Sequence, residues 1–461
     1  MPKNHRKARN QWLSCAVASV VSLAGAPTPA DAEISQPFLT QAPAPQAQIS
    51  APALPAPQAQ SSYVDSGVAW QDPFYLPPEE IPAPGTLIRT QPAPQLLNML
   101  GPDFPGYAEK ILYSSTAIHG DPVAVSGFII EPANPWQGNG PQPTVVFAPG
   151  TRGAGDACAP SKGPGMYGQY DPVNQALGTN YEMGFYQAAS LLGMRVVVTD
   201  YIGLGTPGQH TYVLHTEEGH AVLDAARATT QTGHPVGFYG YSQGGGAVAA
   251  AAEQHATYAP GINLVGTYSG AAPADMIEVM NGVDNSMIVS VLGFAYHGWG
   301  ERFPFFSEIF DAIANDRGKQ FIASTKDACI VDSVLQWAMT DTSTLTTTGE
   351  SFTQAAFRDP RVIELLESQK LGQRPLATPI MVATGGNDDL VPSPQTTQMA
   401  RDYCAQGATV TYLDEGVPAL TPGTKLGLNH VGGMFTQALP AASWLRDRFN
   451  GVPAPNHCGA F

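Results

Sequence analysis

The chain has 461 residues, enough to bury a large core, and its formal net charge is −16. This acidic balance argues against nucleic acid or an anionic membrane surface as the natural partner. Charged residues make up only 13% of the sequence, whereas 48 residues are glycine and 42 are proline. We therefore expect a soluble protein with many loops.

The first 32 residues have the pattern of a signal peptide. Basic residues precede an apolar run over 12–26, and Ala30-Asp31-Ala32 offers a cleavage site. The apolar run is shorter than the ~20 residues that cross a bilayer, and no later run is long enough, so no integral membrane segment is predicted. Residues 33–68, rich in proline, alanine and glutamine, are expected to form a disordered linker. The protein is thus predicted to be secreted or associated with the cell envelope.

From residue 69 onward, short apolar runs alternate with helix-like segments. We expect a hairpin from 110–116 and 122–130, and further strands over 144–148, 194–199, 235–241, 262–269, 379–384 and 409–413. Helices are expected over 180–192, 216–230 and 435–449. This alternation predicts a mostly parallel sheet with helices on both faces, the α/β class.

The alternation breaks between residues 272 and 376. This stretch is helix-like and rich in apolar and aromatic residues. Because so long an interruption must lie outside the sheet, we predict an inserted helical cap over the active-site edge of one catalytic domain, 69–461. Ordinary helical core is the alternative.

A serine stands between a predicted strand and a predicted helix. Residues 240–244 read Gly-Tyr-Ser-Gln-Gly and fit the G-x-S-x-G pattern of a nucleophile elbow. The sharp turn exposes the hydroxyl of Ser242 at the carboxyl edge of the sheet, above a helix N-terminus that favours developing negative charge. Ser242 is the candidate nucleophile.

A nucleophilic serine needs a base and an acid that orients the base. In a fold of this kind the chain order is serine, acid, histidine. The adjacent carboxylates Asp388 and Asp389 follow one strand, and His430 lies in a glycine-rich segment expected to be a flexible loop before the final helix. One aspartate should reach the imidazole and the other should cap the turn, and the residues alone do not say which.

The oxyanion needs two backbone N–H donors. Gln243, the residue after the nucleophile, is expected to supply one, and the loop after residue 148 the other, most simply at Thr151, with Gly153 as the alternative. Two G-x-G-x-x-G matches, at 163–168 and 203–208, lack the strand before or the helix after that a dinucleotide site needs. We predict no metal and no cofactor.

Four cysteines remain after the predicted signal: Cys158, Cys329, Cys404 and Cys458. An even number in an exported chain predicts two disulfides, for which three pairings exist.

Several of these motifs occur together in one known family. They are the elbow at 240–244, Asp200 to Gly205, Cys158 to Ser161, Gly270 to Asp275, Asp388 to Pro392 and the His430 segment. In their order and spacing the chain resembles the secretory lipase family of α/β-hydrolases, which includes the fungal lipase A type and exported actinobacterial lipases. The resemblance extends from about Trp70 to the C-terminus.

The resemblance implies an α/β-hydrolase fold with Ser242, Asp388 and His430 as the catalytic triad, because D-x-x-V-P places the acid at Asp388. It also implies disulfides between Cys158 and Cys329 and between Cys404 and Cys458.

The predicted activity is hydrolysis of acyl esters, such as triacylglycerol-type lipids, by a monomer that contacts a lipid surface transiently. An acyltransferase using the same triad, with a cell-envelope alcohol as acceptor, is one alternative. A non-catalytic, wall-associated binding protein is another, and the intact serine, acid and histidine order argues against it.

Overall fold

The computed structural model describes residues 72–93, 105–163, 167–172 and 175–461. The predicted signal peptide and linker lie outside the described residues. Among the described helices, none combines the length and the hydropathy that a bilayer crossing requires.

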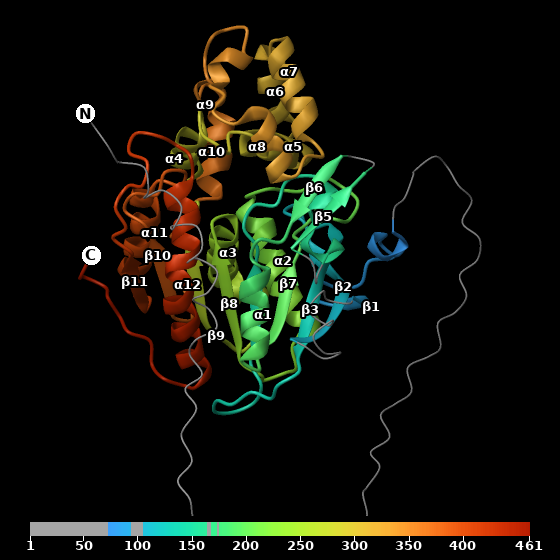
Figure 1. The fold of residues 1–461 in the computed structure, drawn as a ribbon, viewed down its shortest axis with the longest axis vertical. Helices are drawn as coiled ribbons and strands as arrows, with labels where there is room; N and C mark the ends of the chain where they lie inside the picture. Colours follow the sequence, from blue (N-terminus) through green and yellow to red (C-terminus); the bar gives the residue numbers. More distant parts are fainter. Residues whose placement is uncertain (1–71, 94–104, 164–166, 173–174) are drawn as a thin grey trace, which may run out of the picture. The chain divides into compact units, whose positions relative to one another are not determined.

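A nine-stranded sheet forms the centre of the unit that begins at residue 67 (Figure 1). Its strands, in spatial order, are β1 (Leu87–Pro92), β2 (Gly106–Thr116), β3 (Pro122–Pro132), β7 (Arg195–Thr199), β4 (Thr144–Ala148), β8 (Val236–Tyr241), β9 (Leu264–Gly270), β10 (Ile380–Thr384) and β11 (Val410–Asp414). The six strands from β7 to β11 run parallel, whereas β1, β2 and β3 pair antiparallel. β3 also pairs antiparallel with β7.

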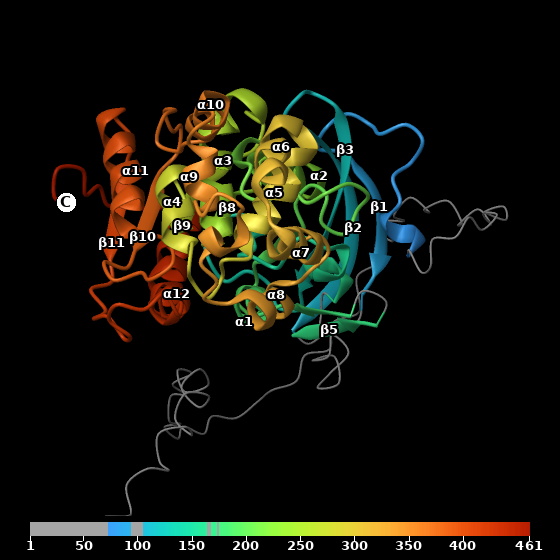
Figure 2. The same ribbon diagram turned by 90° about the horizontal axis from the view of Figure 1, so that it is seen from above.

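Helices cover both faces of this sheet, as predicted, and Figure 2 shows the two layers from above. One face carries α2 (His215–Thr229), α3 (Gln243–Tyr258) and α11 (Ser393–Ala405). The opposite face carries α1 (Met183–Leu191) and α12 (Leu428–Phe449). Apolar side chains of the sheet pack against both layers, and this burial is the main source of stability.

Seven helices lie between β9 and β10, where the cap was predicted. They are α4 (Met276–Val283), α5 (Val291–Arg302), α6 (Pro304–Ile313), α7 (Asp316–Thr325), α8 (Ile330–Trp337), α9 (Phe352–Ala356) and α10 (Pro360–Ser368). Figure 1 shows them stacked on one end of the sheet. Their aromatic residues, including Phe294, Trp299, Phe310 and Phe321, form one apolar core together with Tyr212, Val213 and Leu214.

The remaining elements are short. They are the hairpin of β5 (Gly168–Asp171) and β6 (Ala176–Thr179), and the 3₁₀ turns η1 (Pro73–Tyr75), η3 (Asp156–Cys158), η4 (Pro160–Lys162) and η5 (Thr342–Leu345). The sequence did not predict this hairpin.

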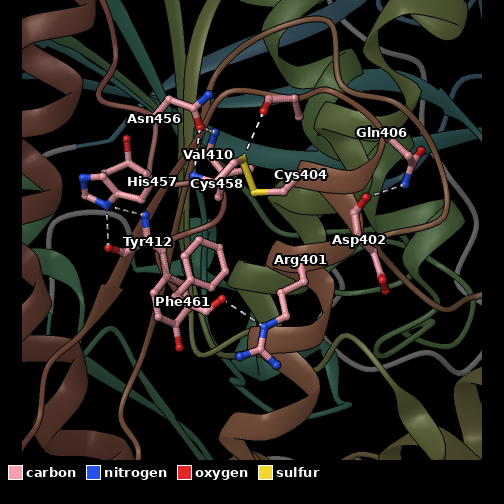
Figure 3. The surroundings of a disulfide bond; sticks show 12 residues. Arg401, Asp402, Cys404, Gln406, Val410, Tyr412, Asn456, His457, Cys458 and Phe461 are labelled. Carbon is pink, nitrogen blue, oxygen red and sulfur yellow. Dashed lines mark hydrogen bonds between the residues drawn. A yellow bond between two sulfur atoms is a disulfide. The ribbon is translucent and has the colours of Figure 1, made fainter.

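Both disulfide pairings implied by the resemblance are confirmed. Cys158–Cys329 joins the loop after β4 to the start of α8 in the cap. Cys404–Cys458 joins α11 to the C-terminal segment, which lies along the edge strand β11 (Figure 3). There, His457 N donates to Val410 O at 2.7 Å.

Candidate active site

Ser242 lies at the turn between β8 and α3 with a strained backbone, φ 58° and ψ −125°. The strain persists because neighbouring backbone holds the turn, including a hydrogen bond from Ser242 N to Gly270 O at 2.9 Å. A Cβ on Gly244 would collide with the carbonyl oxygen of Ala148, so only glycine fits there. The pattern G-x-S-x-G is thus explained by close packing of strand and helix.

Ser242, His430 and Asp388 form one hydrogen-bonded row. Ser242 Oγ lies 2.9 Å from His430 Nε2, and His430 Nδ1 lies 2.7 Å from Asp388 Oδ2. Because a carboxylate accepts, Nδ1 carries the proton and Nε2 is left to accept from the serine. Burial by itself would lower the pKa of His430, but the charge of Asp388 and its hydrogen bond outweigh burial and raise it.

The two aspartates have distinct partners. Asp388 binds the imidazole through Oδ2, and its Oδ1 accepts from the backbone N–H groups of Leu390 and Val391, which fixes its own turn. Asp389 accepts from Leu428 N and His430 N, both at 3.1 Å, and so caps the N-terminus of α12. One aspartate therefore orients the imidazole and the other fixes the helix that carries it.

The expectation that His430 lies in a flexible loop is wrong. α12 begins at Leu428, so His430 belongs to its first turn. The glycines of this segment suggested a loop. Instead, Gly427 is the residue before the helix, with φ 75°, and Gly433 lies within the helix and packs closely against the hydroxyl of Tyr241. That hydroxyl donates to His430 O at 2.7 Å, a contact that nothing in the sequence indicated.

Gln243 is the first residue of α3, where helix geometry leaves the backbone N–H without a partner in the helix. Among the described residues, no hydrogen bond from this N–H is present. It is therefore available to a bound oxyanion.

Several polar groups of the loop after β4 are hydrogen-bonded. Pro149 O accepts from Tyr201 OH at 2.7 Å, and Gly150 N donates to Glu182 at 3.0 Å. Thr151 O accepts from Tyr181 OH at 3.0 Å.

Thr151 Oγ1 lies 2.8 Å from Tyr212 OH, whereas Thr151 N has no hydrogen-bond partner in the described part of the chain. Gly153, the alternative donor, lies opposite Cys329 in an isolated β-bridge, but the hydrogen bonds of that bridge run from Ala154 N to Ala328 O and from Ile330 N to Arg152 O. Within the described residues the N–H of Gly153 has no partner either, so both donors stay open.

An apolar pocket extends from Ser242 into the cap. Most of its lining comes from the cap helices, including Met276, Val291, Leu292, Trp299, Phe306, Phe310 and Phe352, and the rest includes Gln243, Tyr212 and Val391. Such a pocket suits a hydrocarbon chain whose reactive end reaches Ser242.

The sheet order, the elbow serine and the inserted helices define an α/β-hydrolase. Residues 170–457 match the family described as secretory lipase. The chain belongs to the secretory lipase family.

Two curated relatives are similar over 84% of this chain. Lipase A of Arthroderma benhamiae is 26% identical, with 81% of its own length covered. A Mycobacterium tuberculosis protein named as a probable inactive lipase is 27% identical, with 83% covered. The X-ray structure of Candida antarctica lipase A in its closed state has a similar fold, with a TM-score of 0.69 at 20% identity, over 84% of this chain and 88% of that one.

Proposed function

We propose that the protein is an extracellular lipase that hydrolyses esters of long acyl chains by a Ser242–His430–Asp388 mechanism. The observation that carries the proposal is the hydrogen-bonded row Ser242, His430 and Asp388, whose serine lines an apolar pocket. Relatives named as secreted triacylglycerol lipases support the substrate class and the location outside the cell.

In the first step His430 Nε2 takes the proton of Ser242 as Oγ attacks the ester carbonyl. We expect the N–H groups of Gln243 and Thr151 to donate to the oxyanion. His430 then gives the proton to the leaving alcohol, which departs from an acyl-enzyme. Water, activated by the same imidazole, adds to the acyl carbonyl and releases the fatty acid while Ser242 regains its proton. Asp388 keeps the imidazole in the required tautomer and stabilises its charged form.

Activity must be measured on this chain itself, since one relative is named as probably inactive. Replacing Ser242 by alanine should lower p-nitrophenyl ester turnover by at least about 10⁴-fold and abolish labelling by a fluorophosphonate probe. The melting temperature serves as the control for folding. Turnover or labelling that survives in Ser242→Ala would refute the mechanism.

The product distribution separates hydrolysis from acyl transfer. With a competing alcohol present, free fatty acid should remain the main product of the wild-type enzyme. A new ester as the main product would instead favour the acyltransferase.

A further inference from the structure

The side chain of Gln243 is fixed beneath the elbow. It is 2% exposed, and its Nε2 lies 2.7 Å from Glu218 Oε1 and 3.1 Å from His210 Nε2. His210 Nδ1 lies 3.1 Å from the carbonyl oxygen of Ile202, which can only accept, so Nδ1 carries the proton and Nε2 accepts. Both amide hydrogens of Gln243 are therefore donated, one to each partner.

Glu218 is the main acceptor in this arrangement. Its Oε1 also accepts from Val213 N at 3.0 Å, and its Oε2 has no hydrogen-bond partner within the described residues. Burial raises the pKa of Glu218 to about 8. At neutral pH the side chain is mainly the uncharged acid, which can remain buried without a cation and still accept from Gln243 through Oε1.

The elbow has few other side chains with which to fix this first turn of α3. Residues 244–246 are all glycine, because a Cβ on Gly244 would collide with Ala148 O and one on Gly245 with Gly270 O. Glycine leaves the backbone with more conformational freedom than any other residue. In the first turn, Gln243 is therefore the residue whose side chain can anchor the backbone.

We propose that Glu218 is a positioning residue, which holds Gln243 through its side chain so that the Gln243 backbone N–H points at the oxyanion. This role rests on the function proposed above. Glu218 touches no reacting atom. Without the Glu218 acceptor, the backbone N–H of Gln243 is still present but is free to turn away from the oxyanion. Binding of the transition state should therefore weaken, while binding of the substrate in its ground state changes little.

Two variants of Glu218 separate the hydrogen bond from packing. Glu218→Leu removes the acceptor and should lower kcat for p-nitrophenyl butyrate about tenfold, with KM within twofold. That loss is smaller than the 10²–10³ expected when a donor is removed outright. Glu218→Gln keeps an acceptor oxygen and should retain kcat within about twofold.

Glu253→Leu is the matched control for loss of a buried carboxyl. Glu253 lies further along α3, where it accepts from Gly372 N and Tyr403 OH. This variant should lower the melting temperature and leave kcat unchanged. A trifluoromethyl ketone that adds to Ser242 reports directly on oxyanion binding. Its inhibition constant should rise about tenfold in Glu218→Leu and stay unchanged in Glu218→Gln and Glu253→Leu.

Gln243→Leu tests the same contact from the other side and serves if Glu218→Leu does not fold. It keeps the backbone N–H and should lower kcat about tenfold. In the double variant, Glu218→Leu should add no further loss, because the contact is already absent.

Three outcomes would overturn the role: a folded Glu218→Leu with wild-type kcat, a Glu218→Gln as impaired as Glu218→Leu, or a folded Gln243→Leu with wild-type kcat. A wild-type enzyme without ester turnover or fluorophosphonate labelling would instead overturn the proposed function, and this role with it. An active wild type with unimpaired variants overturns the role alone.

Discussion

At the scale of single residues, two adjacent aspartates contribute to the site at different distances from the chemistry. Asp388 binds the imidazole of His430, and Asp389 binds the backbone of the turn that carries it. Asp388→Asn should lower kcat about 10⁴-fold, because the amide favours the wrong imidazole tautomer.

Asp389→Ala should lower stability by about 1 kcal/mol, the usual effect of a lost helix cap. It should lower kcat far less than Asp388→Asn does. Steady-state kinetics and thermal unfolding of both variants check this division. Equal losses of kcat would contradict it.

The pH dependence of kcat/KM follows from the contact between Asp388 and His430. Only neutral His430 can act as base, and its pKa is raised because the charge of Asp388 outweighs burial. kcat/KM should therefore fall as the pH drops through this raised pKa. In Asp388→Asn the midpoint of the acid limb should move to lower pH. An unchanged midpoint would show that a group other than His430 causes the fall in kcat/KM at low pH.

At the scale of elements, we propose that the cap determines which acyl chains reach the serine. Val291 of α5 lines the pocket and is buried. Val291→Trp should shorten the pocket. The value of kcat/KM for a 16-carbon p-nitrophenyl ester should then fall at least about tenfold relative to that for the 4-carbon ester.

The matched control is Leu335→Trp in α8, where the native side chain is 83% exposed. It should leave the ratio of the two substrates unchanged. An unchanged ratio in Val291→Trp would place the acyl chain elsewhere.

The sequence predicted the strands that carry the site to within two residues, because short β-branched runs between breakers allow few other structures. It indicated Ser242, an acid and His430 for another reason, which is that the G-x-S-x-G pattern and the chain order of this kind of fold point to them. It missed the start of α12, since Gly427, Gly432 and Gly433 suggested a loop. Glycine promotes either flexibility or close packing, and only the neighbours in space decide which.

Contacts between distant segments were also beyond sequence reasoning. The site could be located from local patterns, but the anchoring of Gln243 could not. Glu218 lies 25 residues before Gln243 in an ordinary helical pattern, and Tyr241 meets His430 across 189 residues. No local motif marks either pair.

At the scale of the whole molecule, buried carboxyls set the pH dependence of stability. Burial raises the pKa of Asp200 to about 6, of Glu253 to about 7 and of Glu218 to about 8. At these carboxyls the folded state holds protons that the unfolded state releases, so their contribution to stability falls as the pH rises from about 4 to about 8. Burial also lowers the pKa of His210 and His215 to about 4, which has the opposite effect on stability up to about pH 6.5.

Above about pH 6.5 these histidines are mainly neutral in both states, so the melting temperature should be higher at pH 6.5 than at pH 8. Glu218→Gln should reduce this difference, because a glutamine does not ionise. A difference as large as in the wild type would show that Glu218 does not contribute.

The second disulfide holds the C-terminal segment against β11. In the chain-entropy estimate, a crosslink over a sequence separation of 54 residues stabilises by about 4 kcal/mol. Replacing Cys404 and Cys458 together by serine should lower the melting temperature by many degrees and leave kcat at 25 °C unchanged, since neither residue lies at the site. A large loss of kcat in the folded variant would contradict this.

The disulfide connectivity also bears on how the protein is made. Cys158 pairs with Cys329, and Cys404 pairs with Cys458, so the cysteines are joined in their order along the chain. If the chain crosses a membrane from its N-terminus, Cys158 is the only one of these four cysteines that has already emerged when Cys329 appears. Cys458 likewise emerges with only Cys404 unpaired. An oxidant that joins cysteines as they appear therefore yields the native pairs, and biogenesis outside the cell requires no reshuffling step.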